Sequence, residues 1–299
     1  MIDDATLSRR ARALGAHLEP CIGQVYFSPE CHAEYERLGF NASRGEADGV
    51  ALPDPVAYFT SRGSLMGQVA PQVVAATFAV FNPEVVVPCV ETGWGLTDAP
   101  TIFAARRRGA VAQLARVLGT RPEGIERAVE LLERAVAPLN VAGRSLFAGL
   151  RSQWDDPSDP LTRFFHLGDE LREYRGDAHT AAWTSAGLDA VEIGLLTELF
   201  LGLPLRSYIR SRAWSDAQLD AALERLTERG WVEGDAFTPP GHEAREAIER
   251  HTDRQLLPAI IAFGDDLDEL LAIISPWGAA IRDAGGYLRT PAQLAPRHA

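Results

Sequence analysis

The part of the sequence richest in groups that could do chemistry is FFHLGDELREYRGDAHTAAW, at residues 164–183. Arg172 and Arg175 are three residues apart, so their side chains share a face if the stretch is helical. Paired guanidinium groups suit the anchoring of a carboxylate or a phosphate. We therefore expect both arginines, together with Tyr174 between them, to bind a small anionic organic molecule.

A candidate proton-transfer group follows directly. We expect Gly176 to end a helix over 160–175, Asp177 to cap the next helix, and His179 to lie in its first turn. The positive end of a helix dipole disfavours imidazolium, so His179 is expected to be neutral and usable as a general base oriented by Asp177. A plain helix cap and a packing histidine are the alternative interpretation of the same two residues.

His166 and Glu192 stand thirteen residues on either side of His179 and would complete an acid–base cluster if the helices pack antiparallel. The same residues, with Asp177, also form a potential set of metal ligands, although their spacing matches no compact ligand motif. The sequence therefore predicts His179, Asp177, His166 and Glu192 as catalytic residues, with neither a metal nor an organic cofactor.

A second group of candidate residues lies nearer the N-terminus. Tyr26, Tyr58 and Arg62 combine aromatic rings with a cation, a combination found both in small-molecule pockets and in ordinary aromatic cores. Trp94 lies between two glycines in ETGWGLTD (91–98), where we expect a loop that acts either as a mobile lid or as a plain turn. All four residues are candidates for contact with the substrate.

The composition excludes several classes of protein. All 29 basic residues are Arg, which rules out a Schiff-base lysine, a pyridoxal-phosphate enzyme and a Walker-type phosphate loop. The net charge of −12 repels nucleic acid and anionic membranes. The chain has no apolar run of membrane-spanning length and an acidic N-terminus, and its three cysteines lack metal-like spacing. These features favour a cytoplasmic protein.

Periodic apolar residues predict the helices that must position the candidate site. The predicted helices are 3–18, 71–81, 99–118, 122–137, 143–153 and 160–175, with a surface loop at 41–55. Residues 186–239 have the order helix, helix, helix and hairpin, which is that of a winged helix. Two long helical stretches follow at 241–257 and 265–283, the second interrupted at Pro276.

These elements predict a mainly α fold in three parts. Residues 1–184 would form a helical ligand-binding or catalytic domain, with 41–55 as a loop insertion. Residues 185–240 would form a winged-helix-like domain, and 241–299 a C-terminal helical extension. We expect the winged helix to serve in packing or in a homodimer.

The charges of the winged helix argue against DNA binding. Its third helix carries Asp216, Asp220, Glu224 and Glu228 at four-residue spacing, which forms an acidic stripe. A helix that enters the major groove must approach phosphates, and such a stripe opposes that approach. A basic edge made by Arg206, Arg210 and Arg212 keeps a DNA-binding regulator open as an alternative.

Four segments resemble a large family of bacterial proteins described as helix-turn-helix-like. They are LEPCIGQVYFSPE (18–30), AYFTSRGSLMGQVAPQVVAATFAVFNP (57–83), LREYRGDAH (171–179) and AWSDAQLDAALERLTERGWVEGDAFT (213–238). The family pattern has a histidine where Ile22 stands, a second where Tyr174 stands, and a third that His166 matches. The resemblance implies a helix-turn-helix-like fold and no particular reaction, and its departures imply a specialised member, which we expect in secondary metabolism.

Taken together, the residues favour a small-molecule enzyme that uses acid–base chemistry without an organic cofactor. An isomerase, a lyase or a cyclase fits such a constellation of groups. The alternatives are a winged-helix transcription regulator that senses a ligand in the same pocket, and a protein that binds heme or a metal.

Overall fold

The computed structural model describes residues 2–294 and is mainly helical, which confirms the predicted fold class. Its first half contains α1 (Asp4–Ile22), η1 (Gly23–Tyr26), α2 (Pro29–Glu36), α3 (Pro55–Gly63), η2 (Ser64–Met66), α4 (Pro71–Phe78), α5 (Pro83–Leu96), α6 (Ala99–Leu118), α7 (Ile125–Val136), α8 (Ser145–Ser152) and α9 (Pro160–Ser185). Its second half contains α10 (Ala190–Phe200), η3 (Tyr208–Arg212), α11 (Asp216–Glu228), α12 (Pro239–Gln255), α13 (Leu257–Phe263), η4 (Gly264–Asp266), α14 (Leu267–Asp283) and η5 (Pro291–Leu294).

Two short antiparallel hairpins complete the described chain. The predicted loop at 41–55 contains the first, in which β1 (Glu46–Ala47) pairs with β2 (Val50–Ala51). The second joins β3 (Val232–Glu233) to β4 (Ala236–Phe237) after α11, where the wing of a winged helix is expected.

Local sequence sets where many helices begin. α3, α5 and α9 each follow an Asp or Asn whose side chain accepts an N–H from the first turn, and each has Pro in that turn. The capping oxygen satisfies a backbone donor that has no partner within the helix, and the fixed φ of proline suits the first helical position. The start of α9 was predicted from this signal, whereas α3 and α5 carry the same signal and were not predicted from the sequence.

α9 does not end at Gly176, so the predicted break and the new helix after it are wrong. The helix runs unbroken for 26 residues from Pro160 to Ser185. A glycine inside a helix costs about 1 kcal/mol relative to alanine. Burial outweighs this cost, because α9 packs against α1, α6, α7, α8 and α12.

Two further predicted interruptions are also absent. The expected loop at 91–98 is largely the end of α5, which continues to Leu96. A Cβ at Gly93 would lie 1.8 Å from the Thr60 hydroxyl, so this glycine permits close packing of α3 on α5 and does not act as a hinge. Pro276 lies inside α14, which continues past it to Asp283.

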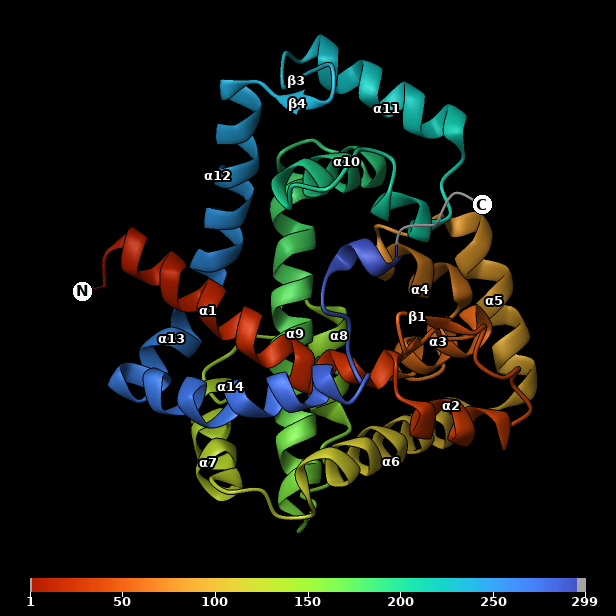
Figure 1. The fold of residues 1–299 in the computed structure, drawn as a ribbon, viewed down its shortest axis with the longest axis vertical. Coiled ribbons are helices and arrows are strands. Elements are labelled where there is room, and N and C mark those ends of the chain that lie inside the picture. The colour runs from red at the N-terminus through yellow and green to blue at the C-terminus, as the bar shows by residue number, and fades with distance from the viewer. Residues whose placement is uncertain (1, 295–299) are drawn as a thin grey trace.

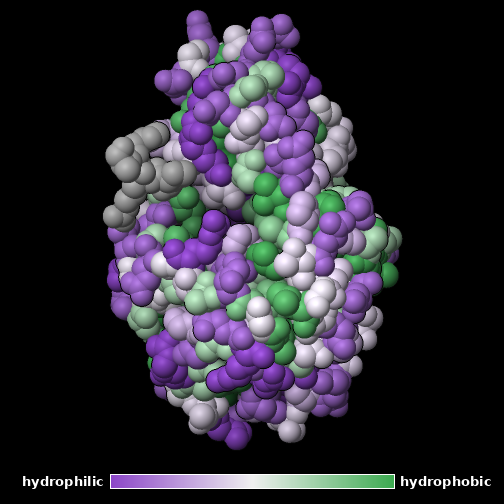
Figure 2. Space-filling view, turned by 90° about the vertical axis from the view of Figure 1, so that its right-hand side faces the viewer, coloured by the Kyte–Doolittle hydropathy of each residue, from purple (hydrophilic) through white to green (hydrophobic). Residues whose placement is uncertain are grey.

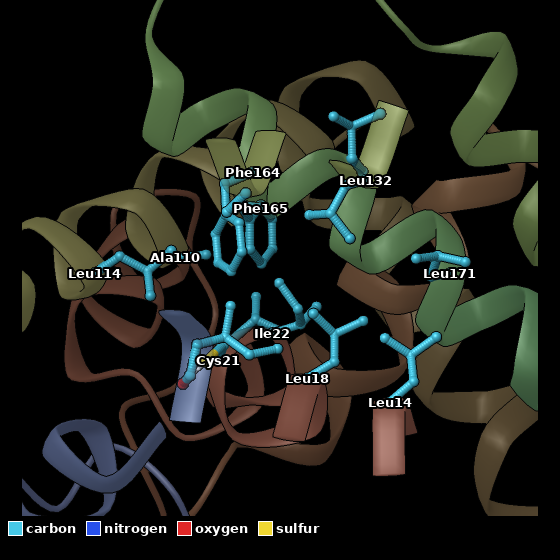
Figure 3. Packing of buried hydrophobic residues seen from close by; sticks show 14 of the residues in the cluster. Leu14, Leu18, Cys21, Ile22, Ala110, Leu114, Leu132, Phe164, Phe165 and Leu171 are labelled. Carbon is cyan, nitrogen blue, oxygen red and sulfur yellow. Dashed lines mark hydrogen bonds between the residues drawn. The ribbon is translucent and has the colours of Figure 1, made fainter. Parts of the chain in front are cut away.

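The largest hydrophobic core forms around α9, which runs through the centre of the molecule with α1 crossing it (Figure 1). Figure 3 shows Leu18 and Ile22 of α1 facing Phe164 and Phe165 of α9, with Leu114 of α6 beside them. The C-terminal helices belong to the same core, since α14 packs along α1 and α13 packs against α7.

The winged-helix-like segment forms a second, smaller core at one end of the molecule (Figure 1). It joins the end of α9 to α10, α11 and the start of α12, with Leu196, Leu219 and Ile248 buried among its members. The middle of its three helices is η3, a 3-10 helix of five residues. α12 then returns along α9 toward α1, so it links the two cores. Within residues 2–294 no helix combines the length and apolar character needed to cross a membrane.

Candidate functional site

A cavity of about 1410 Å³ lies between the helical body and the winged-helix-like segment. Side chains from α1, α3, α9, α10, η3 and α12 line it, together with the chain that follows α14. Figure 2 shows the surface hollowed between the winged-helix-like end and the body. The space is large enough for an organic ligand of ordinary size.

The lining of this cavity is strongly basic for so acidic a protein. Ten arginines and three glutamates line it, whereas the whole chain has a net charge of −12. Aromatic rings from both halves of the chain form much of the rest of the wall, among them Tyr58, Phe81 and Tyr287. A basic, aromatic cavity attracts anions that have an apolar part.

Glu173 holds one cluster of charges at the cavity. Its carboxylate accepts hydrogen bonds from Arg62 Nη2 at 2.7 Å, Arg172 Nη1 at 2.8 Å and the Tyr26 hydroxyl at 3.2 Å. Burial acts to raise the pKa of Glu173, but Arg62 and Arg172 lower it to about 2. Arg172 Nε also donates to Glu19, at 3.0 Å. The two arginines are therefore already paired with carboxylates.

Glu249 of α12 holds a second cluster. It accepts from Arg245 Nη1 at 2.7 Å and from Arg175 Nη2 at 3.0 Å, and its carboxylate lies 3.9 Å from His179 Nδ1. Burial acts to raise the pKa of Glu249, and Arg245 is the largest influence that brings it below its usual value. α12 thus supplies the counter-ion for an arginine on the cavity face of α9.

The surroundings of His179 fix the protonation of its ring. Nδ1 lies 3.1 Å from Thr252 Oγ1, and that hydroxyl donates its proton to the Ile248 carbonyl at 2.9 Å. A hydroxyl has one proton to give, so His179 Nδ1–H donates to Thr252 and Nε2 of the neutral ring is unprotonated. Burial, with smaller effects of Arg245 and Arg175, lowers the pKa of His179 to about 4.

The cavity brings together six of the residues predicted from the sequence. Arg172, Arg175 and His179 line it from one face of α9. Tyr26 and Arg62 meet them through Glu173, and the Tyr58 ring lies 5.0 Å from that of Tyr26. The two groups of candidate residues, separate in the sequence, therefore share one wall.

Asp177 does not join them. Residues two apart on a continuous helix point to different faces, and Asp177 faces a smaller cavity of about 600 Å³. It accepts from the backbone N–H groups of Leu146 and Phe147, each at 3.2 Å, and so caps α8. Asp177 was expected to cap a helix containing His179 and to orient that ring, and it does neither. Burial raises the pKa of Asp177 to about 6.

His166 and Glu192 also lie outside the large cavity. His166 is buried against Trp154, with its Nε2 3.4 Å from Glu170. Glu192 forms a capping box with Asp189 and accepts from Arg225. The expected acid–base cluster with His179 is therefore not assembled. Nor do residues 2–294 contain any group of three or more His, Cys, Asp or Glu side chains placed to hold a metal.

Tyr174 and Trp94 are packing residues in this structure. The Tyr174 hydroxyl donates to the Gln255 carbonyl at 3.0 Å, and its ring contacts Phe147. Trp94 Nε1 donates to the Val69 carbonyl at 3.0 Å. Both rings satisfy their polar atoms within the protein core and neither lines the large cavity.

Several cavity residues were not predicted from the sequence as part of a ligand site. Glu249 and Arg245 lie in α12, far along the chain, and Tyr208, Arg212 and Tyr287 come from η3 and the segment after α14. Their convergence depends on the path of the chain in space. Glu173 was not among the predicted site residues, although it pairs with Arg172 at 2.8 Å.

Two residues of the acidic stripe of α11 have partners within the winged-helix-like segment. Arg206 pairs with Asp220 at 2.5 Å and Arg210 with Asp216 at 2.7 Å. Two arginines of the possible DNA-binding edge are thus turned toward the stripe, and the third, Arg212, lines the cavity.

The fold and the site define a mainly helical protein with a ligand-sized cavity beside a winged-helix-like segment. The chain belongs to a helix-turn-helix family, whose model matches residues 11–288. This family supports the resemblance seen in the sequence over nearly the whole chain. The comparisons find no similar curated protein and no similar solved structure.

Proposed function

We propose that this protein is a cytoplasmic enzyme that binds a small anionic organic molecule in the large cavity and uses His179 to move a proton. An isomerisation, an elimination or a cyclisation needs only such a transfer and no organic cofactor. Biosynthesis of secondary metabolites is the setting that we favour.

The observation that carries the proposal is the state of His179. Its Nδ1 is committed to Thr252, and its Nε2 makes no hydrogen bond with any residue of 2–294. The ring is part of the cavity lining, so Nε2 is the base available to a ligand there. With a pKa of about 4, the ring is neutral at physiological pH.

The residues expected to serve as the second acid or base do not reach this site, so the proposal assigns that role to water or to a group of the substrate. Tyr26 is unsuited, because burial raises the pKa of its hydroxyl well above the usual value and Glu173 already accepts its proton. A single base is sufficient for an elimination in which the base takes a proton and the leaving group departs as an anion with its bonding electron pair, because no acid must then protonate it.

A ligand-sensing regulator is the second candidate. Its supporting observation is that Thr197 of α10, Arg210 of η3 and Arg245 of α12 line the same cavity as the helical body. A ligand would therefore touch both parts of the molecule. The acidic α11 opposes DNA binding, so we rank this function below the enzyme.

Proton exchange with solvent tests the enzyme. A deproteinised metabolite extract of the native cells is incubated in D₂O with wild-type protein, with His179→Gln or with no protein, and analysed by mass spectrometry. We expect at least one anionic metabolite to gain deuterium or to be converted by the wild type, and not by His179→Gln. Asp177→Asn, outside the cavity, should behave as the wild type. Identical spectra for all samples would contradict the proposal.

A further inference from the structure

The arginines of the large cavity fall into two sets according to their partners. Those that face α9 and α12 are matched by carboxylates, as at Glu173 and Glu249. Arg210 and Arg289 pair with Asp216 and Asp283 outside the lining. Within residues 2–294, three cavity arginines have no carboxylate partner: Arg44, Arg212 and Arg282.

The carboxylate-free arginines carry positive charge that no carboxylate of residues 2–294 within ion-pair distance offsets. A guanidinium that already bonds a buried carboxylate gains little from a second anion, because the pair is close to neutral as a unit. One without such a partner forms a charge-assisted hydrogen bond with the first anion that reaches it. The anionic group of the ligand is therefore expected to bind the arginines without a carboxylate partner, and not Arg172 and Arg175.

Two of these arginines are held in place by aromatic rings. Arg212 lies 4.5 Å from the centre of the Phe81 ring and 4.7 Å from that of Tyr208, and also donates to the Tyr208 hydroxyl. Arg282 lies 5.8 Å from the Tyr287 ring. Stacking leaves the edge of a guanidinium, with its N–H donors, directed away from the ring. Arg44 has no such support and is left out of the site.

The segments that carry these rings contact each other near Tyr287. η3, which carries Tyr208 and Arg212, packs against η5, which follows Tyr287. Burial raises the pKa of the Tyr287 hydroxyl, Glu19 and Tyr208 raise it further, and Arg172 acts to lower it. The Tyr287 hydroxyl donates to Glu19 at 3.0 Å, and Glu19 also accepts from Arg172. Glu19 therefore connects this corner of the cavity, around Tyr287 and Tyr208, to Arg172.

An aromatic wall leads from this corner toward α9. Phe81, under Arg212, has its ring 5.7 Å from Tyr58, and Tyr58 lies 5.0 Å from Tyr26. A flat, unsaturated ligand can stack along these faces while its charged end stays at the arginines.

We propose that Arg212 and Arg282 form the anion subsite of the cavity and that its ligand is an aromatic or otherwise flat molecule with a carboxylate, sulfonate or phosphate at one end. This inference rests on the proposed binding of an anionic molecule and does not depend on catalysis by His179. Arg62 and Arg172 then have a structural role, because their ion pairs with Glu173 hold the aromatic wall of the cavity in place.

Two fluorescent probes of the same shape test the subsite. 1-Anilinonaphthalene-8-sulfonate carries an anion, and N-phenyl-1-naphthylamine is its uncharged counterpart. Both are titrated into wild-type protein and into Arg212→Gln, Arg282→Gln and Arg210→Gln. Arg210 is a matched control, because it lines the cavity from the same 3-10 helix but is paired with Asp216.

We expect Arg212→Gln and Arg282→Gln each to weaken binding of the sulfonate about tenfold, the loss of one charge-assisted contact. Arg210→Gln should change it less than about twofold, and the amine should bind all four proteins alike. Equal weakening of both probes, equal effects of all three substitutions, or no saturable sulfonate binding by the wild type would overturn the subsite. The deuterium test of His179 is independent of each of these outcomes.

Discussion

Asp177 and His179 stand two residues apart on α9 and serve different cavities. Asp177 lies beside the smaller cavity and accepts the N–H groups of Leu146 and Phe147, whereas His179 lines the larger one and donates to Thr252. The two side chains therefore have separate roles, one in holding α8 and the other at the candidate site, and they can be changed independently.

Loss of the Asp177 carboxylate should affect stability and leave ligand chemistry intact. Asp177→Ala removes the acceptor for two backbone donors of α8, which is expected to lower the free energy of unfolding by about 1–2 kcal/mol. Asp177→Asn keeps an acceptor oxygen and should cost less. Urea unfolding at pH 7 measures both. An equal cost for both variants, or loss of the deuterium exchange in Asp177→Asn, would contradict this role.

The pKa of Asp177 gives its contribution a definite pH dependence. Burial raises the pKa to about 6 in the folded protein, above its ordinary value of 3.8. Between these values the folded state holds the proton more tightly, so this contribution is complete below 3.8 and is lost as the pH rises through about 6. The stability of the wild type relative to Asp177→Asn should therefore fall across this window. A flat difference would show that the carboxyl is not buried as described.

For His179 the pH dependence of the free energy of unfolding should have the opposite sign. Burial lowers its pKa from 6.5 to about 4, so the unfolded chain binds the proton more readily between these values. Its contribution is present above 6.5 and is lost as the pH falls through about 4. The stability of the wild type relative to His179→Gln should rise with pH across this range, as measured by urea unfolding. The rate of proton transfer should likewise persist down to about pH 4, since a base must be neutral to act.

Glu173 should be the most sensitive single position in the site. Its side chain is fully buried between Arg62 and Arg172. Glu173→Gln leaves two guanidinium groups without their shared carboxylate, and breaking a buried pair in this way costs about 3–5 kcal/mol. Glu126→Gln is the matched control, because Glu126 pairs with Arg121 at an exposed position and should cost less than about 1 kcal/mol. Thermal unfolding measures the stability of both variants. Similar losses of stability would mean that the buried ion pairs of Glu173 contribute little to the fold.

Local signals predicted much of the fold and only part of the site. The start of α9 at Pro160 follows from Asp159, a cap whose effect is confined to its own turn. The helix end predicted at Gly176 was wrong because the cost of a glycine in a helix is also local, and packing of α9 on five neighbouring helices outweighs it. With the false break, Asp177 was placed beside His179, although a continuous helix points the two apart.

The contacts that complete the site are far apart in the sequence. Arg175 meets Glu249, 74 residues away, because α12 returns along α9 after the β3–β4 hairpin. Arg172 meets Glu19 across 153 residues, where α1 crosses α9. The spacing of neighbouring residues holds no information about pairs so far apart. The sequence therefore identified the arginines but could not show that they already form ion pairs with carboxylates.

The charge pairs of α11 predict weak DNA binding. Because Asp216 and Asp220 pair with Arg210 and Arg206, the segment offers a duplex few uncompensated cations. Fluorescence anisotropy with a labelled duplex at 50 mM salt should show no saturation below about 100 µM protein, the weak end of nonspecific affinity. Tight binding with a steep salt dependence would instead favour the ligand-sensing regulator. A double change of Asp216 and Asp220 to Asn, which releases both arginines, should raise the affinity.

The tautomer of His179 can be measured without knowing any substrate. Two-bond ¹H–¹⁵N spectra distinguish protonated from bare ring nitrogens, and His179 should carry its proton on Nδ1 at pH 7. His32 is an internal reference of opposite sense, since its Nε2 lies 3.1 Å from the Tyr26 carbonyl, which accepts and never donates. Its proton should therefore be on Nε2.

Thr252→Val tests whether this tautomer matters for the chemistry. The substitution keeps the shape of the side chain but removes the acceptor for Nδ1–H, so His179 should populate both tautomers while His32 is unchanged. Because only the ring with a bare Nε2 is correctly prepared to take a proton from the cavity, the deuterium exchange should slow about tenfold. If the tautomers mix and the exchange rate stays at the wild-type value, His179 is not the base. If His179 is already protonated on Nε2 in the wild type, the hydrogen-bond chain through Thr252 runs the other way, and the base assignment falls with it.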